Sequence, residues 1–99
     1  MAVYWISFRL EDDATYSERR DALYDVVSRR VKQWWVDTTS FIVADIETSI
    51  DSLASEFKKV ATSKGDLVLI GMPGFKDGRI TGGSFDQYIL QLVPFIKKV

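Results

Sequence analysis

The chain has 99 residues, of which 46% are hydrophobic and 13% aromatic, and its formal net charge is −1. This length and composition predict one globular domain and exclude a disordered chain. The absence of cysteine and histidine excludes disulfides, thiolate or imidazole metal sites and histidine-based catalysis, so any chemistry must use Asp, Glu, Lys, Arg, Tyr or Ser.

The first quarter of the chain predicts a strand followed by a helix. Residues 3–10 are nearly all apolar, with many aromatic and β-branched side chains, which is typical of a central strand. An acidic segment, 11–13, ends this strand. Apolar residues then recur on one stripe and predict a helix over about 16–31. Thr15 and Glu18 have the spacing of a capping box at its start.

The middle of the chain predicts a hairpin, a second helix and a fourth strand. The runs 34–36 and 40–44 favour a tight hairpin, with one continuous bent strand as the alternative because no glycine marks the turn. A second helix is predicted from a cap at residue 48 or 49 to the basic residue and glycine at 64–65. Residues 67–70 are apolar on both faces, as in a buried strand.

The last third has a different character. Residues 73–83 hold four of the six glycines and predict a flexible loop. Helical spacing then predicts a helix over about 84–93, with Ser84 as its cap. We therefore divide the chain into a core (1–72), a glycine-rich loop (73–83) and a C-terminal interaction segment (84–99).

The element order β-α-β-β-α-β predicts a ferredoxin-like α+β fold. Right-handed crossovers build a four-stranded antiparallel sheet with both helices on one face, to which a C-terminal helix or swapped segment is added. The other face of the sheet stays open. Strand residues such as Trp5, Trp34 and Phe41 alternate with core positions, so some of them must lie on that face. An aromatic open face is a candidate interface, and we expect a homodimer.

The acidic segment after the first strand is the candidate metal and catalytic site. Carboxylates near a strand end suit Mg²⁺ or Mn²⁺, and the candidate ligands are Glu11, Asp12 and Asp13. The alternative is a solvated loop whose negative charges favour the start of the next helix.

Basic and aromatic side chains after this segment are candidates for binding nucleic acid. Five basic residues would form a phosphate-binding strip. They are Arg19, Arg20, Arg29, Arg30 and Lys32. Trp34 and Trp35 would stack on bases. The alternatives are an ordinary charged helix face and one tryptophan in the core with the other in a dimer contact, because adjacent strand residues point to opposite faces.

A third candidate site would bind a small anionic ligand such as a nucleotide between two protomers. Gly82 and Gly83 place backbone amides at the expected start of the last helix, which is a workable anion site. Arg9, at the end of the first strand, adds a positive charge. The alternative is a plain linker to a swapped C-terminal element.

Three segments, 2–10, 34–43 and 64–70, resemble the small SinR-like bacterial proteins. Those belong to a wider group of CRISPR-associated (Cas-two-like) ferredoxin-like nucleases and VapD-type ribonucleases. The resemblance covers about 2–71. It implies a ferredoxin-like homodimer and a defence, phage or toxin–antitoxin context. In the nuclease branch it implies an aspartate at the end of the first strand that binds a divalent cation across the dimer. This chain has Arg9 there, which would repel the cation.

We therefore expect a non-catalytic or degenerate homodimeric module, without a cofactor, that binds protein or nucleic acid. One alternative is a Mg²⁺- or Mn²⁺-dependent nuclease that uses the segment 11–13, and another is the binder of a small anionic ligand. The start of the chain lacks the basic and apolar regions of a signal peptide. No apolar run approaches the ~20 residues that span a bilayer. The expected location is the cytoplasm, without a membrane partner.

Overall fold

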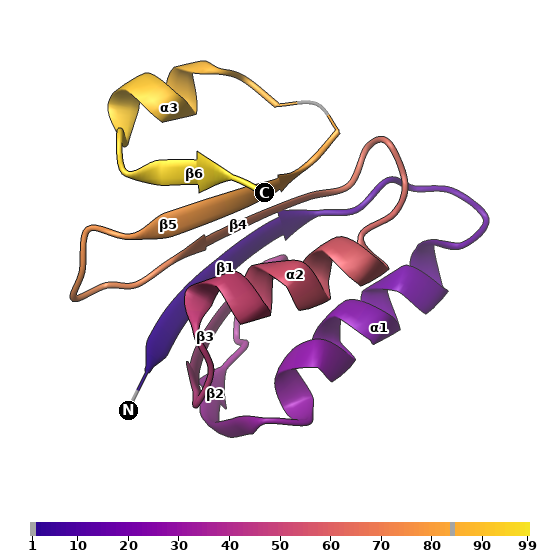
Figure 1. The fold of residues 1–99 in the computed structure, drawn as a ribbon. Coiled ribbons are helices and arrows are strands. Elements are labelled where there is room, and N and C mark those ends of the chain that lie inside the picture. The colour runs from indigo at the N-terminus through magenta and orange to yellow at the C-terminus, as the bar shows by residue number, and fades with distance from the viewer. Residues whose placement is uncertain (1, 84) are drawn as a thin grey trace.

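A computed structural model describes residues 2–83 and 85–99, which form one mixed sheet of six strands and three helices (Figure 1). The strands are β1 (Val3–Arg9), β2 (Val31–Trp35), β3 (Phe41–Ile46), β4 (Leu67–Gly71), β5 (Gly78–Gly82) and β6 (Ile96–Lys98). The helices are α1 (Tyr16–Ser28), α2 (Ile50–Val60) and α3 (Tyr88–Leu92). No helix of this described part is long and apolar enough to cross a membrane.

The α+β class and the element order β-α-β-β-α-β as far as β4 are confirmed, whereas the four-stranded sheet is wrong. The strand order is β2-β3-β1-β4-β5-β6, and every neighbouring pair is antiparallel except β5–β6, which is parallel. Two further strands therefore continue the sheet past β4. They satisfy backbone groups that β4 would otherwise leave unpaired along its whole outer edge.

The loop predicted over 73–83 is wrong for residues 78–82, which form β5. This strand has glycines at both ends and no long apolar run, so its sequence carries no strand pattern. Tertiary contacts fix it instead. Arg79 of β5 is 7% exposed, and its Nε lies 2.7 Å from the Asp51 carboxylate in the first turn of α2. The same guanidinium donates to Asp77.

The helix predicted over 84–93 is only partly correct, since α3 covers five residues and the chain then returns as β6. The expected cap, Ser84, lies outside the described residues. The β5–α3–β6 segment is a crossover unit that places β6 parallel to β5 in the sheet of the same chain. The C-terminal segment thus completes its own sheet.

The predicted hairpin is confirmed, because β2 pairs with β3 in antiparallel register. The helix ends differ from the predictions. Helix α1 ends at Ser28 rather than near residue 31, and Thr15 forms no capping hydrogen bond because its hydroxyl contacts Asp13 and Arg19. Ser49 does cap α2, by accepting a hydrogen bond from the Ser52 amide at 3.1 Å.

Helix α2 ends earlier than predicted, at Val60, and residues 64–65 lie in the turn that follows it. Its C-cap is Ala61, whose φ of −90° and ψ of 76° leave the helical region. The basic residue and glycine that predicted the end of the helix belong instead to the approach to β4.

The core lies between the sheet and the helices α1 and α2, which cover one face as predicted (Figure 1). Alternate residues of the central strands point into it, which gives β1 and β3 a strict alternation of buried and half-buried positions. The fully buried side chains include Tyr4, Ile6, Leu23, Val27, Ile42, Ile46, Leu53, Phe57, Val68 and Ile70.

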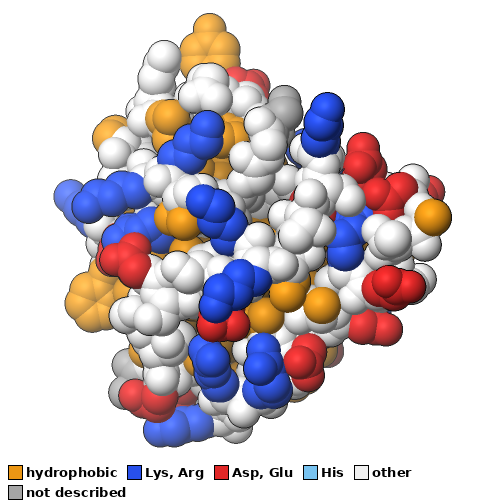
Figure 2. All heavy atoms as spheres, turned by 45° about the vertical axis from the view of Figure 1, so that its right-hand side comes forward, with side chains coloured by type: hydrophobic (Ala, Val, Ile, Leu, Met, Phe, Trp, Pro, Cys, Tyr) orange, Lys and Arg blue, Asp and Glu red, His pale blue; other side chains and the backbone are white. Residues whose placement is uncertain are grey.

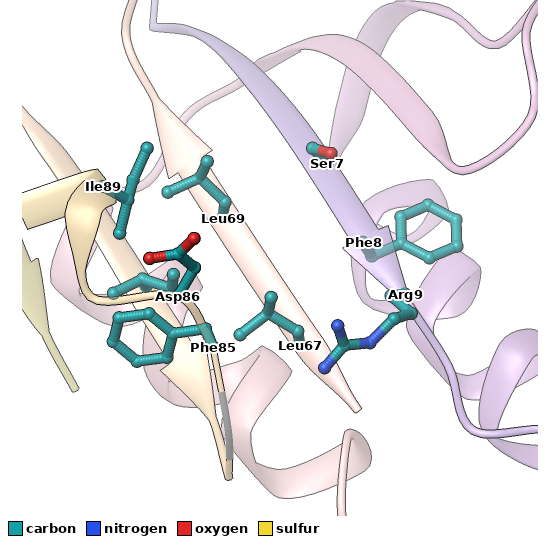
Figure 3. A pocket seen from close by; sticks show the side chains of 9 residues that line it. Ser7, Phe8, Arg9, Leu67, Leu69, Phe85, Asp86 and Ile89 are labelled. Atoms are coloured by element: carbon teal, nitrogen blue, oxygen red, sulfur yellow. The ribbon is translucent and has the colours of Figure 1, made fainter. Parts of the chain in front are cut away.

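The opposite face of the sheet, called the open face here, carries half-buried apolar side chains. They are Val3 and Trp5 of β1, Phe41 and Val43 of β3, and Leu67 and Leu69 of β4. Helix α3 lies on this side of the sheet, beside β4 and β5 (Figures 1 and 3). The open face is therefore covered at one end only.

Gly71 is required by the position of Trp5 on the open face. The two residues are paired across β1 and β4, and the indole lies across the glycine. A Cβ added at Gly71 would lie 2.1 Å from Cζ2 of Trp5. Any larger residue at position 71 must therefore displace the ring.

We expect Gly71→Ala to lower the free energy of unfolding by about 1–3 kcal/mol, as overpacking does, and to shift the indole N–H resonance of Trp5. Urea denaturation and NMR spectra measure the two effects. Gly74→Ala is the matched control, because its added Cβ meets nothing within 4 Å. Equal changes in both variants would contradict the close packing of Trp5 on Gly71.

Candidate functional site

The buried ion pair between Arg19 and Asp66 organises the end of the molecule where the acidic segment lies. Asp66 is fully buried and Arg19 is 7% exposed. Nη1 of Arg19 lies 2.6 Å from Oδ2 of Asp66 and contacts Oδ1 as well. The Asp66 carboxylate also accepts hydrogen bonds from the backbone amides of Glu11 (2.8 Å) and Ser63 (3.0 Å). One carboxylate thus joins α1, the segment after β1 and the turn before β4.

Asp13, one of the predicted metal ligands, belongs to the same network. Its Oδ1 accepts from Nη2 of Arg19 at 2.7 Å and from the Thr15 amide at 2.9 Å, and its Oδ2 accepts from the Ser63 hydroxyl at 3.0 Å. The Arg19 guanidinium lowers the pKa of the Asp13 carboxyl from 3.8 to about 2, with further help from Thr15 and Ser63. Through these contacts Asp13 stabilises the packing of the segment after β1 against α1 and the turn before β4.

The other two acidic candidates do not join Asp13 to form a ligand set. Glu11 contributes its backbone amide to Asp66 and its backbone oxygen to Arg19 (2.8 Å). Asp12 is exposed. Across residues 2–83 and 85–99, no group of three or more carboxylates has the arrangement of a metal site.

The five basic residues predicted to form a phosphate-binding strip contact different partners. Arg19 binds Asp66 and Asp13, and three others form exposed or half-exposed ion pairs. These pairs are Arg29–Asp25 (3.1 Å), Arg30–Glu56 (3.9 Å) and Lys32–Glu47 (3.3 Å). Arg20 instead lies over the ring of Tyr24. In the view of Figure 2, Lys and Arg side chains gather over the left and centre with a few Asp and Glu among them, whereas most Asp and Glu side chains lie at the right.

Gly82 and Gly83 do not lie at a helix start, so the helix-start geometry expected of the anion site is wrong. Gly82 ends β5, whereas α3 begins only at Tyr88. Both glycines instead allow a close approach to the turn before β4. A Cβ at Gly82 would lie 2.5 Å from the Asp66 backbone oxygen, and one at Gly83 would lie 2.8 Å from that of Lys64. Gly82 also has a φ of +154°.

Trp34 and Trp35 point to opposite faces of the sheet, as their adjacency predicts. Trp34 pairs with the core residue Ala44, and its ring contacts that of Tyr24 on α1 at 6.5 Å. Trp35 pairs with Val43 on the open face, and its ring contacts that of Phe41 at 6.4 Å. Trp35 is 44% exposed, so it extends the apolar surface of the open face toward β2.

A groove on the open face, absent from the sequence predictions, lies between the sheet and the segment that contains α3. It has a volume of about 340 Å³. Figure 3 shows Phe85, Asp86 and Ile89 across from Leu67 and Leu69 of β4, with Arg9 at the end of β1. Nε of Arg9 donates to the Gly65 backbone oxygen at 3.0 Å. The groove forms because the chain after β5 folds back over the open face, which the sequence pattern does not predict.

Both edge strands of the sheet carry features that oppose pairing with another strand. The register of β2 against β3 shifts between Val31 and Gln33, and Lys32 lies at this irregularity. At the other edge, β6 has three residues, of which Lys97 and Lys98 are exposed. Bulges, short strands and lysines are the usual means by which proteins protect sheet edges from further pairing.

Comparison with known proteins found no matching protein family, no matching curated protein and no matching solved structure.

The lowered pKa of Asp13 predicts a loss of stability in acid. The ionised carboxylate is favoured in the folded state, so its contribution is complete above the unfolded pKa of 3.8 and is lost as the pH falls to about 2. Melting temperatures between pH 7 and pH 2 measure this effect. In Asp13→Asn we expect a lower melting temperature at pH 7 and a weaker dependence between pH 4 and pH 2.

Asp12→Asn is the matched control for this experiment, because Asp12 is exposed and lies beside Asp13 in the same segment. It should keep the acid dependence of the unchanged protein. The assignment to Asp13 fails if Asp13→Asn melts with the same slope against pH as the unchanged protein.

Proposed function

We propose that this protein is a non-catalytic interaction module that works as a homodimer, with the open faces of two sheets packed against each other. The observation that carries the proposal is the apolar open face, where Trp5, Phe41 and Val43 lie beside the exposed Trp35 without a covering helix. Removal of such a surface from water is favourable, and contiguous apolar patches of this kind mark interaction sites.

The size of the open face suits a second copy of the chain. The molecule has principal extents of 37, 32 and 23 Å, so its larger faces have room for a standard interface of ~800 Å² per partner. Two sheets that pack face to face lie ~10 Å apart and interdigitate their side chains. The half-buried aromatic residues would supply the centre of that interface.

The protected edges favour this face-to-face arrangement over a sheet that continues from one protomer to the next. The irregularity at Lys32 and the short lysine-bearing β6 oppose pairing at either edge. The apolar surface that a partner can cover is therefore on the face of the sheet.

Opposite charges at the two ends of the open face support a particular orientation of the second copy. Arg9 lies at the end of β1, whereas Asp45 of β3 pairs with Val3 near its start. A twofold axis that lies in the interface and is perpendicular to β1 brings Arg9 of one protomer toward the partner's Asp45. By symmetry, the interface contains two such pairs of opposite charges. Complementary charges at the rim of an interface fix its register.

We also propose that β1 to β4 with α1 and α2 are a ferredoxin-like unit, to which β5, α3 and β6 are added. This agrees with the resemblance to SinR-like proteins. The nuclease alternative has less support, because the Arg19 guanidinium binds the Asp13 carboxylate that would be needed for a cation. In this proposal the dimer in turn binds a protein or a nucleic acid.

Val43→Lys should weaken the homodimer at least about tenfold, because a charge replaces an apolar side chain at the centre of a dry interface. Sedimentation equilibrium over a range of concentrations measures the dissociation constant. The control is Phe75→Lys, since Phe75 is 70% exposed in the turn between β4 and β5. A monomeric mass for the unchanged protein at every concentration would reject the homodimer.

Arg9→Glu and Asp45→Arg should each weaken the dimer, because each places like charges at both ends of the interface. The double variant restores opposite charges in exchanged positions and should recover most of the affinity. The same sedimentation experiment measures all three variants. Additive losses in the double variant would argue against the antiparallel orientation, even if the protein is a dimer.

A further inference from the structure

We propose that a cleft between α1 and the β2–β3 turn binds a small phosphate monoester that also carries hydroxyl groups, such as a sugar phosphate. The cleft has a volume of about 320 Å³. This is at the lower end of the ~300–1,000 Å³ range of small-molecule sites. It lies in the helix-bearing layer and not on the open face, so it is independent of the proposed dimer.

The floor of the cleft is a rigid set of aromatic rings. Phe8 comes from β1 and Tyr24 from α1, and their rings meet edge to face with centroids 5.7 Å apart. The Tyr24 ring also contacts Trp34 on β2. Phe8 is 8% exposed, so this floor is continuous with the core. A ligand would therefore meet a preformed surface.

Arg20, which lines the cleft, supplies a positive charge. The guanidinium carbon lies 4.7 Å from the centroid of the Tyr24 ring. All N–H bonds of a guanidinium lie in one plane, and the contact with an aromatic ring engages its charge rather than these donors. Such a planar fork binds phosphate oxygens in pairs.

Arg20 differs in this respect from the arginines that stabilise the fold. Within the described part of the chain, four other arginines contact carboxylates. They are Arg19, Arg29, Arg30 and Arg79. The described contact of Arg20 is with the ring of Tyr24, which stabilises the cation but leaves its donors available for an anion.

The other wall of the cleft is formed by hydroxyl-bearing residues of the β2–β3 turn. Thr38, Thr39 and Ser40 line it, and Tyr16 of α1 lies on the same cleft. Ser40 has a φ of +59°, in the left-handed region that is unfavourable for a non-glycine residue. Its backbone oxygen accepts a hydrogen bond from the Phe8 amide at 3.1 Å, which fixes the turn to β1. Strained residues of this kind are concentrated at binding sites.

Asp37, which also lines the cleft, decides the class of ligand. A carboxylate repels a bare phosphate ion, but it accepts hydrogen bonds from hydroxyl groups. The ligand that satisfies both Arg20 and Asp37 therefore has a phosphate at one end and hydroxyl donors at the other. The charge of −1 for the whole chain does not favour a long nucleic acid here.

The test is a titration of ¹⁵N-labelled protein with ribose 5-phosphate, followed by NMR. Saturable shifts should include the indole N–H of Trp34, which packs on the floor of the cleft. Arg20→Gln should weaken binding at least about tenfold, since a hydrogen bond to a charged group is lost. Arg29→Gln is the matched control at the C-cap of the same helix, outside the cleft, and should bind as the unchanged protein does.

Parallel titrations with ribose, inorganic phosphate and a short single-stranded RNA distinguish the alternatives. Binding of inorganic phosphate as tight as that of ribose 5-phosphate would overturn the role of Asp37. Tighter binding of the RNA at the same resonances would overturn the small-molecule ligand. Equal losses in both arginine variants, or no saturable shift at millimolar ligand, would overturn the site itself. A dispersed spectrum of Arg20→Gln verifies that this variant is folded.

Discussion

The buried ion pair of Arg19 and Asp66 is the interaction on which one whole end of this protein depends. Two charges removed from water are stable only when all their hydrogen-bonding groups have partners, and here both have them. Asp66 accepts from Arg19 and from the amides of Glu11 and Ser63. These groups come from three separate segments. The ion pair therefore fixes the start of α1, the end of β1 and the turn before β4 relative to one another. The acidic segment that suggests a metal site is thereby part of the folded framework.

The uneven covering of the sheet has the largest consequence for function. Helices α1 and α2 cover one face, whereas α3 reaches only the part of the other face beside β4 and β5 (Figure 1). A chain of 99 residues whose sheet has protected edges and an apolar open face lowers its free energy most by packing that face on another surface. The self-association we propose follows from this imbalance and needs no catalytic group.

The two proposed surfaces lie in different layers, and this separation has a physical basis. The open face is formed by alternate residues of the strands, and the other residues of the same strands face the helices. Phe8 and Arg9 illustrate the division, because Phe8 lies on the floor of the cleft beside α1 while Arg9 lies on the open face with Leu67. A ligand in the cleft and a second protomer on the open face can therefore be bound together. Trp34 and Trp35 divide between the layers in the same way.

Local patterns in the sequence determined the α+β class, the order of elements from β1 to β4, the hairpin and the covering of one face by two helices. Those features follow from hydrophobic periodicity, which a sequence displays directly. Strand β5 was decided only by tertiary structure, because its glycines weaken any strand pattern while the pairing with β4 and the Arg79–Asp51 contact stabilise it. Tertiary structure also decided three other features. They are the partners of Arg19, the close approach of Gly82 to the Asp66 backbone and the cleft that contains Arg20. Each joins residues far apart in the chain, and side-chain contacts over such distances leave no periodic signal in a single sequence.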